Sequence, residues 1–360
     1  MKSQPKFSQN QGETEEQILE IVDLSRDGSG VAKNSKGQVV FVPFSAPGDR
    51  LKVRWTSSSR RYVEAEILEI VEASPVRQTP PCSIFGKCGG CQWQHIPYAL
   101  QWQTKVKGAQ ESLRRMKIPL PERMDLEPAQ RVWEYRNRIQ LRGQGQELGF
   151  YQAGSHQLVN VNRCEIARPE INESWEQTRT EGLRRSHPYK VEVEVTSQGE
   201  IQRTWNAPHS AAGFRQVHDE QNEKLKQWIH HSLRPAPVLY DLYGGSGNLS
   251  RLLLDKMGEI HCVDRMTSMK SQGSQDRMYF HDASVATWIR EQARSVPSSS
   301  FLPVAAILDP PREGMGTVAD SIIIALEQLG VREAILVGCN ADAWAKDLSR
   351  WVIRHWKVQS

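Results

Sequence analysis

The chain has 360 residues, enough for two or three domains, with a formal net charge of +4 and a pI of about 8.7. This weakly basic balance is compatible with nucleic-acid binding but does not require it. The N-terminal stretch lacks the apolar core of a secretion signal, and no run is long enough to span a membrane, so we expect a cytoplasmic location. Six cysteines without a secretion signal argue against a disulfide framework and favour thiolate chemistry or metal binding.

The N-terminal part of the chain predicts a small β-barrel behind a disordered segment. Residues 1–16 are polar, charged and without period, which is typical of disorder. Residues 17–72 contain short strand patterns separated by Pro-Gly and Asp-Gly turns. Basic residues gather around Trp55 and Tyr62, a mixture that suits RNA phosphates and bases, although a solvated strand face has the same pattern. These basic residues are Arg50, Lys52, Arg54, Arg60 and Arg61.

Cysteines mark the start of the central domain, which we place at residues 73–235. Cys82, Cys88 and Cys91 all fall within one glycine-rich stretch of ten residues, so their thiolates can surround one soft metal centre. Cys164 is the nearest unassigned cysteine and the expected fourth ligand. Four thiolates can hold zinc or an iron–sulfur cluster, and the spacing alone does not decide between them. Three unliganded cysteines in a loop are the remaining alternative.

The rest of the central domain is expected to combine a helix with an antiparallel sheet. Residues 98–116 have helical periodicity, and their basic side chains suit phosphate groups. Strand patterns recur between residues 132 and 206 and predict the sheet, which would return Cys164 to the other three cysteines.

From residue 236 to residue 360, strands alternate with helices, which predicts an α/β domain with a doubly wound, mostly parallel sheet. The glycine loop from Gly244 to Gly247 joins the first strand to the first helix, as in sheets that bind nucleotide-like ligands. A tight connection without a ligand is the alternative. The expected strands are 238–242, 260–263, 278–280, 304–308 and 334–337, and the expected helices are 248–257, 284–293, 319–329 and 343–354.

Polar residues follow the strands of this sheet, at the edge where such sheets bind ligands. Asp264 and Asp282 come at the ends of the second and third strands, and the segments 309–312 and 338–340 follow the fourth and fifth. Cys339 directly precedes an expected helix, whose N-terminus favours a thiolate, so this residue is a candidate nucleophile. A buried structural cysteine is the alternative, and we assign that role to Cys262 inside a strand.

Together these residues resemble the RNA (uracil-5-)methyltransferases, especially the branch with a TRAM domain and a [4Fe-4S] cluster that methylates large-subunit ribosomal RNA. The resemblance extends from about residue 17 to the end of the chain. Its motifs are GSGVAKNSKGQVVFVPFSAPGD, CSIFGKCGGCQWQHIPY, EYRNR, GFRQVH, LYDLYGGSGNLS, LDPPREG and GCNADAWAKDL. It implies a TRAM (OB-like) barrel, a central domain and a Rossmann-like methyltransferase domain, with the cluster, rather than zinc, on Cys82, Cys88, Cys91 and Cys164.

The resemblance also implies a reaction with S-adenosyl-L-methionine as methyl donor and RNA as substrate, without an evident obligate protein partner. Cys339 would add to C6 of a uridine, which makes C5 nucleophilic toward the sulfonium methyl group. Arg312 would face RNA phosphate or the charge that develops on the base. Ribosomal RNA is the expected substrate, and transfer RNA is the alternative. The implied donor-binding residues are Gln216, Tyr243, Gly245, Asn248, Asp264, Asp282 and Asp309.

Several positions depart from the family pattern. Gly338 and Ala341 stand where Ser and Pro are usual around the nucleophile, and His218 stands where Asn is usual after the Gln-Val pair. Gly244 replaces a common Cys. The sequence stops at Ser360, before the family segment whose acidic residue removes the C5 proton. The expectation of an active methyltransferase therefore stands beside an alternative, a catalytically impaired iron–sulfur RNA-binding protein of the same family.

Overall fold

The computed structural model describes residues 16–207, 215–265, 277–295 and 304–359. The segment predicted to be disordered lies outside these residues, apart from Glu16, which begins the first strand. The chain divides into two compact units, Met1–Val106 with Gln152–Ser155, and Lys107–Tyr151 with His156–Ser360. The predicted boundaries at residues 72/73 and 235/236 fall inside these units and stay predictions. Among the described residues, no helix is both long and apolar enough to cross a membrane.

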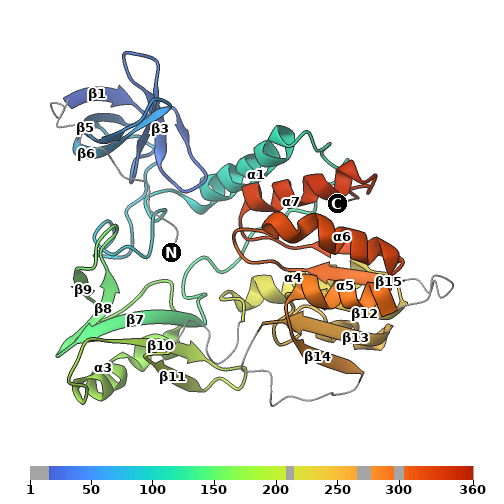
Figure 1. The fold of residues 1–360 in the computed structure, drawn as a ribbon. Helices are drawn as coiled ribbons and strands as arrows, with labels where there is room; N and C mark the ends of the chain where they lie inside the picture. Colours follow the sequence, from blue (N-terminus) through green and yellow to red (C-terminus); the bar gives the residue numbers. More distant parts are fainter. Residues whose placement is uncertain (1–15, 208–214, 266–276, 296–303, 360) are drawn as a thin grey trace. The chain divides into compact units, whose positions relative to one another are not determined.

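The first unit contains a six-stranded sheet with the order β1-β5-β6-β4-β3-β2 (Figure 1). Buried and exposed positions alternate at the start of β5, so Leu51 and Val53 enter the core while their neighbours are more exposed. Irregular pairing between β5 and β6 marks bulges, which bend a sheet. The strands are β1 (Glu16–Glu20), β2 (Asp23–Leu24), β3 (Gly30–Lys33), β4 (Val39–Val42), β5 (Arg50–Ser58) and β6 (Tyr62–Glu72).

The segment after β6 packs back onto this sheet. The guanidinium of Arg77 forms an ion pair with the buried carboxylate of Asp49 at 2.7 Å. His95 is also buried, and its Nε2 donates to the carbonyl oxygen of Ser45 at 3.0 Å. These contacts anchor both ends of the cysteine loop to the first unit.

The second unit begins with an antiparallel sheet in the order β11-β10-β7-β8-β9, which confirms the sheet predicted between residues 132 and 206. Trp175 is almost fully buried at the start of α3 and contacts Phe150 edge-on, so the helix packs on the sheet. The elements are α1 (Tyr98–Arg115, shared with the first unit), β7 (Arg138–Gln144), β8 (Glu147–Tyr151), β9 (Leu158–Asn160), α2 (Pro169–Glu173), α3 (Trp175–Leu183), β10 (Tyr189–Val195) and β11 (Ile201–Trp205).

A five-stranded parallel sheet follows in the second unit, with the order β14-β13-β12-β15-β16 (Figure 1). Its two faces bury separate cores: α5, α6 and α7 contribute to one, and α4 with the short η1 to the other. This arrangement confirms the predicted doubly wound sheet. The elements are α4 (Asp219–Ser232), β12 (Ala236–Leu242), η1 (Arg251–Asp255), β13 (Met257–Asp264), β14 (Met278–Asp282), α5 (Val285–Ser295), β15 (Val304–Leu308), α6 (Ala319–Gln328), β16 (Val331–Leu336) and α7 (Ala341–Ile353).

The helix predicted over residues 248–257 is wrong. The structure has only the 3-10 turn η1 there, and β13 begins at Met257, which pairs with Ala236 of β12. Side chains that would lie on the helix are used elsewhere: the Ser250 hydroxyl donates to Asp241, and Asn248 bonds to Asn222. These side-chain bonds and the early strand pairing leave too few residues for a helix of ordinary length.

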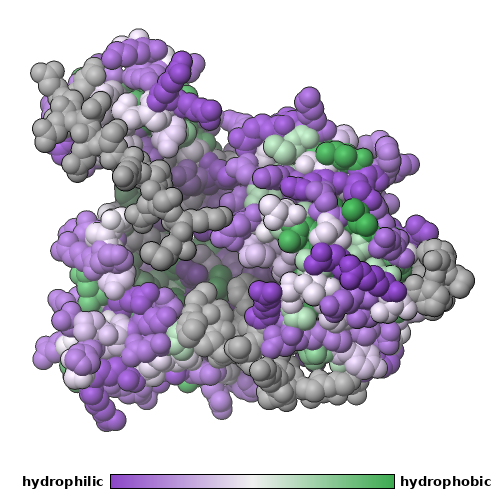
Figure 2. All heavy atoms as spheres, viewed as in Figure 1, coloured by the Kyte–Doolittle hydropathy of each residue, from purple (hydrophilic) through white to green (hydrophobic). Residues whose placement is uncertain are grey.

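Hydrophilic residues predominate on the face of the molecule seen in Figure 2, and hydrophobic residues are scattered in small groups. The large apolar side chains lie mainly in the cores of the two units.

Candidate active site

The glycine loop after β12 has the tight geometry that a ligand cradle needs. Tyr243, Gly245 and Gly247 all have positive φ angles, of 62°, 54° and 75°. A Cβ atom on Gly244 would lie 2.5 Å from the carboxyl carbon of Asp241, so a side chain does not fit there without movement. The sequence therefore needs glycine in this loop for close packing as well as for turning.

Carboxyl groups surround this loop at the carboxyl edge of the sheet. Asp264 accepts a hydrogen bond from the amide of Gly245 at 3.1 Å, and it pairs in register with Asp282 on β14. The amide of Asp309 donates to the carbonyl oxygen of Leu242 at 3.2 Å, which places Asp309 beside the end of β12. The structure thus brings the predicted acidic residues to one edge, as the strand-end rule requires.

Burial changes the protonation of these acids. It raises the pKa of Asp264, with a further contribution from the charge of Asp282. Burial and the charge of Asp264 raise the pKa of Asp309 to about 6. Asp241, which sequence reasoning missed, is fully buried in β12, and burial raises its pKa to about 7. Several carboxyl groups with raised pKa beside a glycine loop are typical of a functional site.

Tyr243 extends this cluster toward α7. Burial and the nearby carboxyl groups of Asp347 and Asp264 raise its pKa to about 12, so the phenol stays protonated at neutral pH. Its amide donates to the carbonyl oxygen of Val263 at 2.8 Å, which holds the loop against β13. The phenol is therefore a neutral group held near the acidic cluster.

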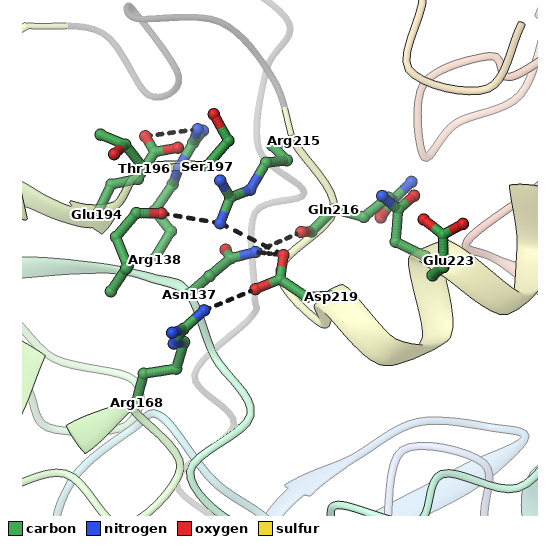
Figure 3. Close-up of polar contacts among 12 residues, drawn as sticks. Asn137, Arg138, Arg168, Glu194, Thr196, Ser197, Arg215, Gln216, Asp219 and Glu223 are labelled. Atoms are coloured by element: carbon green, nitrogen blue, oxygen red, sulfur yellow. Dashed lines mark hydrogen bonds and ion pairs between the residues drawn. The ribbon is translucent and has the colours of Figure 1, made fainter. Parts of the chain in front are cut away.

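The predicted donor residues Gln216 and Asn248 are held by polar contacts from outside the parallel sheet. The Asn137 side-chain amide donates to the backbone oxygen of Gln216 at 2.9 Å and to Asp219 at 2.6 Å (Figure 3). Arg168 donates to the other carboxylate oxygen of Asp219 at 3.1 Å. Asn137 belongs to the EYRNR motif and Gln216 to the GFRQVH motif. Both motifs are part of the family resemblance, which was the sequence signal that these two segments matter.

Cys339 and Arg312 line one small pocket with a volume of about 10 Å³, and their roles stay predictions. The Cys339 side chain is exposed and directly precedes Asn340, the N-cap residue of α7. Asn340 Oδ1 accepts hydrogen bonds from the amides of Asp342 at 3.0 Å and Ala343 at 3.2 Å. The cap fixes the first turn of α7, and with it the place of the thiol.

Tight packing shapes the Cys339 pocket. A Cβ atom on Gly338 would lie 2.7 Å from Cβ of Trp344, which explains why this chain has no Ser at that position. In the same pocket lining, a Cβ atom on Gly314 would lie 2.5 Å from the carboxylate of Asp347. Asp347 is buried and accepts a hydrogen bond from the amide of Met315 at 2.7 Å. Sequence reasoning missed Asp347, although a charged residue two turns into α7 was visible.

Cys262 is buried inside β13, which confirms its structural role. Burial raises the pKa of its thiol, so this cysteine stays protonated. The Ser250 hydroxyl and the Asp241 carboxylate lie near its sulfur, at 3.5 Å and 3.7 Å. Cys262 is therefore a natural control for experiments on Cys339.

The other four cysteines stay a predicted metal site. Cys82, Cys88 and Cys91 belong to the first unit and Cys164 to the second. Burial raises the pKa of the Cys88 thiol, and Cys91 and Cys82 raise it further. In the part of the chain that the structure describes, no group of three or more His, Cys, Asp or Glu side chains is arranged to hold a metal ion.

Two of the basic residues of the barrel are engaged in surface ion pairs. Lys52 pairs with Glu16 at 2.7 Å, and Arg54 pairs with Glu66 at 2.5 Å. Exposed pairs of this kind contribute little to stability and are easily exchanged for other partners. RNA binding by this face stays a prediction.

Comparison with known proteins identifies the first unit's sheet and the overall fold. The family model described as "tRNA (uracil(54)-C(5))-methyltransferase, TRAM domain" matches residues 19–76. The crystal structure of Pyrococcus abyssi tRNA (uracil-54, C5)-methyltransferase in complex with S-adenosyl-L-homocysteine superposes with a TM-score of 0.64. That match covers 92% of both chains at 19% identity and therefore concerns the fold alone.

Curated relatives cover most of the chain. An uncharacterized RNA methyltransferase of Bdellovibrio bacteriovorus is 29% identical over 345 residues, which are 92% of this chain and 85% of the relative. The 23S rRNA (uracil(1939)-C(5))-methyltransferase of Histophilus somni is 33% identical over 397 residues, which are 91% of this chain and 88% of the relative. On this similarity, the chain belongs to the family of RNA uracil-C5 methyltransferases.

Proposed function

We propose that this protein transfers a methyl group from S-adenosylmethionine to C5 of a uridine in RNA, through a covalent bond between Cys339 and C6. One observation carries the proposal: the exposed thiol of Cys339 lies at the strand end after β16, on the same sheet edge as the glycine loop. Family membership supports the same reaction. Gly244, Asp264 and Asp309 mark the donor side of that edge.

The thiolate of Cys339 attacks C6 of the uracil, and the electron pair of the C5–C6 double bond moves toward C5 and O4. C5 then attacks the methyl carbon of the donor substrate, and the carbon–sulfur bond of the sulfonium breaks, so that S-adenosylhomocysteine leaves. Loss of the C5 proton to a base restores the double bond and expels the Cys339 thiolate. Arg312, which lines the same pocket, can stabilise the negative charge while it lies on the base.

The donor side follows from the contacts around the loop. Asp264 already accepts two amide hydrogen bonds, from Gly245 and Arg265, yet its carboxylate has further lone pairs for the ribose hydroxyl groups. We place the methionine part of the donor near Gly245 and the adenine near Asp282. Gln216, Tyr243, Asn248 and Asp309 complete the proposed donor site.

Within this family we propose ribosomal RNA as the substrate. The relative from Histophilus somni, with 33% identity, is named for 23S rRNA, whereas the family model that matches the barrel is named for a tRNA enzyme. Methylation assays with unmodified 23S rRNA and with unmodified bulk tRNA separate the two. Preference for tRNA would overturn this part of the proposal and leave the chemistry intact.

The proposal includes a [4Fe-4S] cluster on Cys82, Cys88, Cys91 and Cys164. Three of these soft donors share one loop, and the amide of Gly90 lies 3.4 Å from the Cys88 sulfur, a contact of the kind that surrounds cluster sulfurs. When bound, the cluster would cross-link the four cysteines and have a structural role. No step of methyl transfer passes through it. Anaerobic purification should give brown protein with absorbance near ~400 nm and about four irons per chain. Cys88→Ser should lose the colour and Cys262→Ser should keep it, whereas bound zinc would contradict the cluster.

Tritium release tests the methyl transfer itself. RNA that contains 5-tritiated uridine is incubated with the full chain and S-adenosylmethionine, and both tritium release and methylation are measured. Cys339→Ala should abolish both, whereas Cys262→Ser should keep most of the activity. An active Cys339→Ala variant would exclude the covalent mechanism. RNA binding by the parent protein without tritium release or adduct would instead support the impaired RNA-binding alternative.

A further inference from the structure

The second unit contains a larger pocket that the proposed reaction does not use. This pocket has a volume of about 580 Å³, within the usual size range of ligand pockets. It shares no lining residue with the pocket of Cys339. The two pockets are therefore separate features of the surface. Its lining includes Arg131, Tyr135, Arg168, His218, Asp219 and Glu220.

One wall of this pocket is a preformed aromatic stack. The rings of Tyr135 and His218 lie 4.7 Å apart between centroids, with an interplanar angle of 18°. His218 Nε2 donates to the carbonyl oxygen of Arg131 at 3.0 Å, which fixes the imidazole ring. An isolated β-bridge between Arg136 and His218 holds the backbone below it. Flat, fixed rings of this kind are suited to stacking a nucleobase.

The acidic groups of the pocket are already neutralised. Asp219 is bound by Asn137, Arg168 and Arg215, as Figure 3 shows in part. Glu220 accepts hydrogen bonds from the amides of Gln130 and Arg131, both at 3.2 Å, and pairs with Lys224 at 3.1 Å.

The pocket also contains a positively charged group, Arg131, that can bind a ligand. The side chain of Arg131 is exposed; its charge helps to lower the pKa of Glu170, but that carboxylate is already paired with Arg168, so the Arg131 guanidinium can donate hydrogen bonds to a phosphate group. His218 Nδ1 is buried and is not available to a ligand, so the histidine contributes its ring face. An aromatic wall and an exposed cation together match a nucleotide.

We propose that this pocket binds a nucleotide of the substrate RNA other than the uridine that reacts with Cys339. The inference rests on the proposed function, because it assigns a second contact to the same RNA. The base stacks on the Tyr135–His218 wall, and the phosphate of the nucleotide pairs with Arg131. A second, unstacked nucleotide held here fixes the register of the RNA while the reactive uridine reacts at Cys339.

Binding measurements test this inference without requiring turnover. We use the full chain and a fluorescein-labelled 12-nucleotide single-stranded RNA of mixed sequence, and we measure anisotropy. Tyr135→Ala should weaken RNA binding by about tenfold to a hundredfold, the range expected for loss of one stacked base. Tyr135→Phe keeps the ring and should stay within about twofold of the parent. Tyr279→Ala, which removes a tyrosine from the same unit but outside the pocket, is the matched control.

Two further variants examine the other groups. Arg131→Gln should weaken RNA binding and reduce its salt dependence, because one phosphate contact is lost. His218→Asn removes the second ring and should give a loss between those of Tyr135→Phe and Tyr135→Ala. The Kd for S-adenosylhomocysteine checks folding, and it should stay at the parent value in every variant.

Cross-linking identifies the bound nucleotide. RNA substituted with 5-iodouridine should cross-link to Tyr135 or His218, at a nucleotide different from the one that is methylated. Parent-like RNA binding by Tyr135→Ala would overturn the inference, as would a cross-link from the methylated uridine itself. The same holds if Tyr135→Ala weakens binding of free UMP or AMP but leaves RNA binding unchanged. If tritium release fails but Tyr135→Ala still weakens RNA binding, only the proposed function is lost.

Discussion

The glycine loop and the Cys339 pocket lie at the same edge of one parallel sheet, but they are built in different ways. Around the loop, burial raises the pKa values of Asp241, Asp264 and Asp309. Around Cys339, close packing of glycines against side chains of α7 shapes an exposed pocket. The proposed donor side is therefore mainly an electrostatic structure, and the side that carries the Cys339 thiol is mainly a packing structure. Substitutions that change charge and those that change volume should therefore act on different sides.

The largest expected effect concerns Asp241 and the pH dependence of stability. Its pKa is about 7 in the folded protein and 3.8 ordinarily, so the folded state keeps a proton that the unfolded state has lost. The free energy of unfolding should therefore fall as pH rises from about 4 to about 7, by at most about 4 kcal/mol. Asp241→Asn has no proton to lose, and its side-chain oxygen can still accept the Ser250 hydroxyl. At pH 8 this variant should be more stable than the parent, and at pH 4 equally stable.

Urea unfolding at several pH values between 4 and 8 measures this difference. Glu291→Gln is the control, because Glu291 is an exposed carboxylate on α5 of the same unit. If the parent and Asp241→Asn lose stability in parallel as pH rises, the electrostatic description of the donor side is wrong.

The next effect concerns Asp347 of α7, whose carboxylate binds the amide of Met315 and so holds the loop after Arg312 against α7. Asp347→Ala leaves the buried amide of Met315 without an acceptor, which costs about 1–3 kcal/mol of stability. It also frees the loop that carries Arg312, so kcat for methylation should fall by about tenfold to a hundredfold. Asp347→Asn keeps an acceptor for the amide and should retain most of the activity.

Steady-state kinetics with RNA, together with urea unfolding, checks both expectations. The pH profile of kcat separates the two possible roles of Asp347. A positioning role leaves the profile of Asp347→Asn like that of the parent. An equal loss of activity in the Ala and Asn variants, with a changed profile, would mean that the carboxylate takes part in proton transfer.

The glycine-loop side and the Cys339 side of the sheet edge also differ in how much of each could be predicted from the sequence. The run from Val304 to Leu308 is wholly buried, and its predicted limits match β15 because a continuous apolar run between turn signals is typical of a parallel strand. Asp264 and Asp309 could be placed because parallel strands end at a common edge. Asp347 could not, since helical periodicity does not tell which loop a buried polar residue contacts.

The missing helix at residues 248–257 has the same explanation. Its apolar pattern, LSRLLL, is typical of a helix, but Ser250 bonds to Asp241 on the preceding strand β12 and Asn248 bonds to Asn222 on α4. Local patterns therefore predicted the strands and the strand ends that carry the proposed donor site. Side-chain contacts between distant segments determined the rest.

A smaller effect is expected at Gly338, where the packing of the thiol side can be tested directly. Gly338→Ala places a methyl group 2.7 Å from Cβ of Trp344, so α7 must move. Overpacking of this kind costs about 2 kcal/mol, and displacement of Cys339 should lower kcat without changing the Kd for S-adenosylhomocysteine. A double-mutant cycle with Trp344→Gly, which removes the Cβ atom in question, measures the coupling of the two positions. Additive effects would show that the contact does not limit the pocket.

The smallest effect is expected at Asp264, and it tests whether the donor side binds through its carboxyl groups. Asp264→Ala removes the proposed partner of the ribose hydroxyls and should weaken S-adenosylhomocysteine binding about tenfold, or about 1.4 kcal/mol. Calorimetric titration measures this Kd, and Asp255→Ala is the control. The raised pKa of Asp264 provides a second test. Protonation of Asp264 removes its charge-assisted hydrogen bonds, so the affinity of the parent protein for S-adenosylhomocysteine should fall as pH is lowered through that pKa. Asp264→Ala should lose this pH dependence, because the group that titrates is gone. A variant that binds weakly but keeps the full pH dependence would move the ribose contact to another acid of the edge, for which Asp309 is the nearest choice.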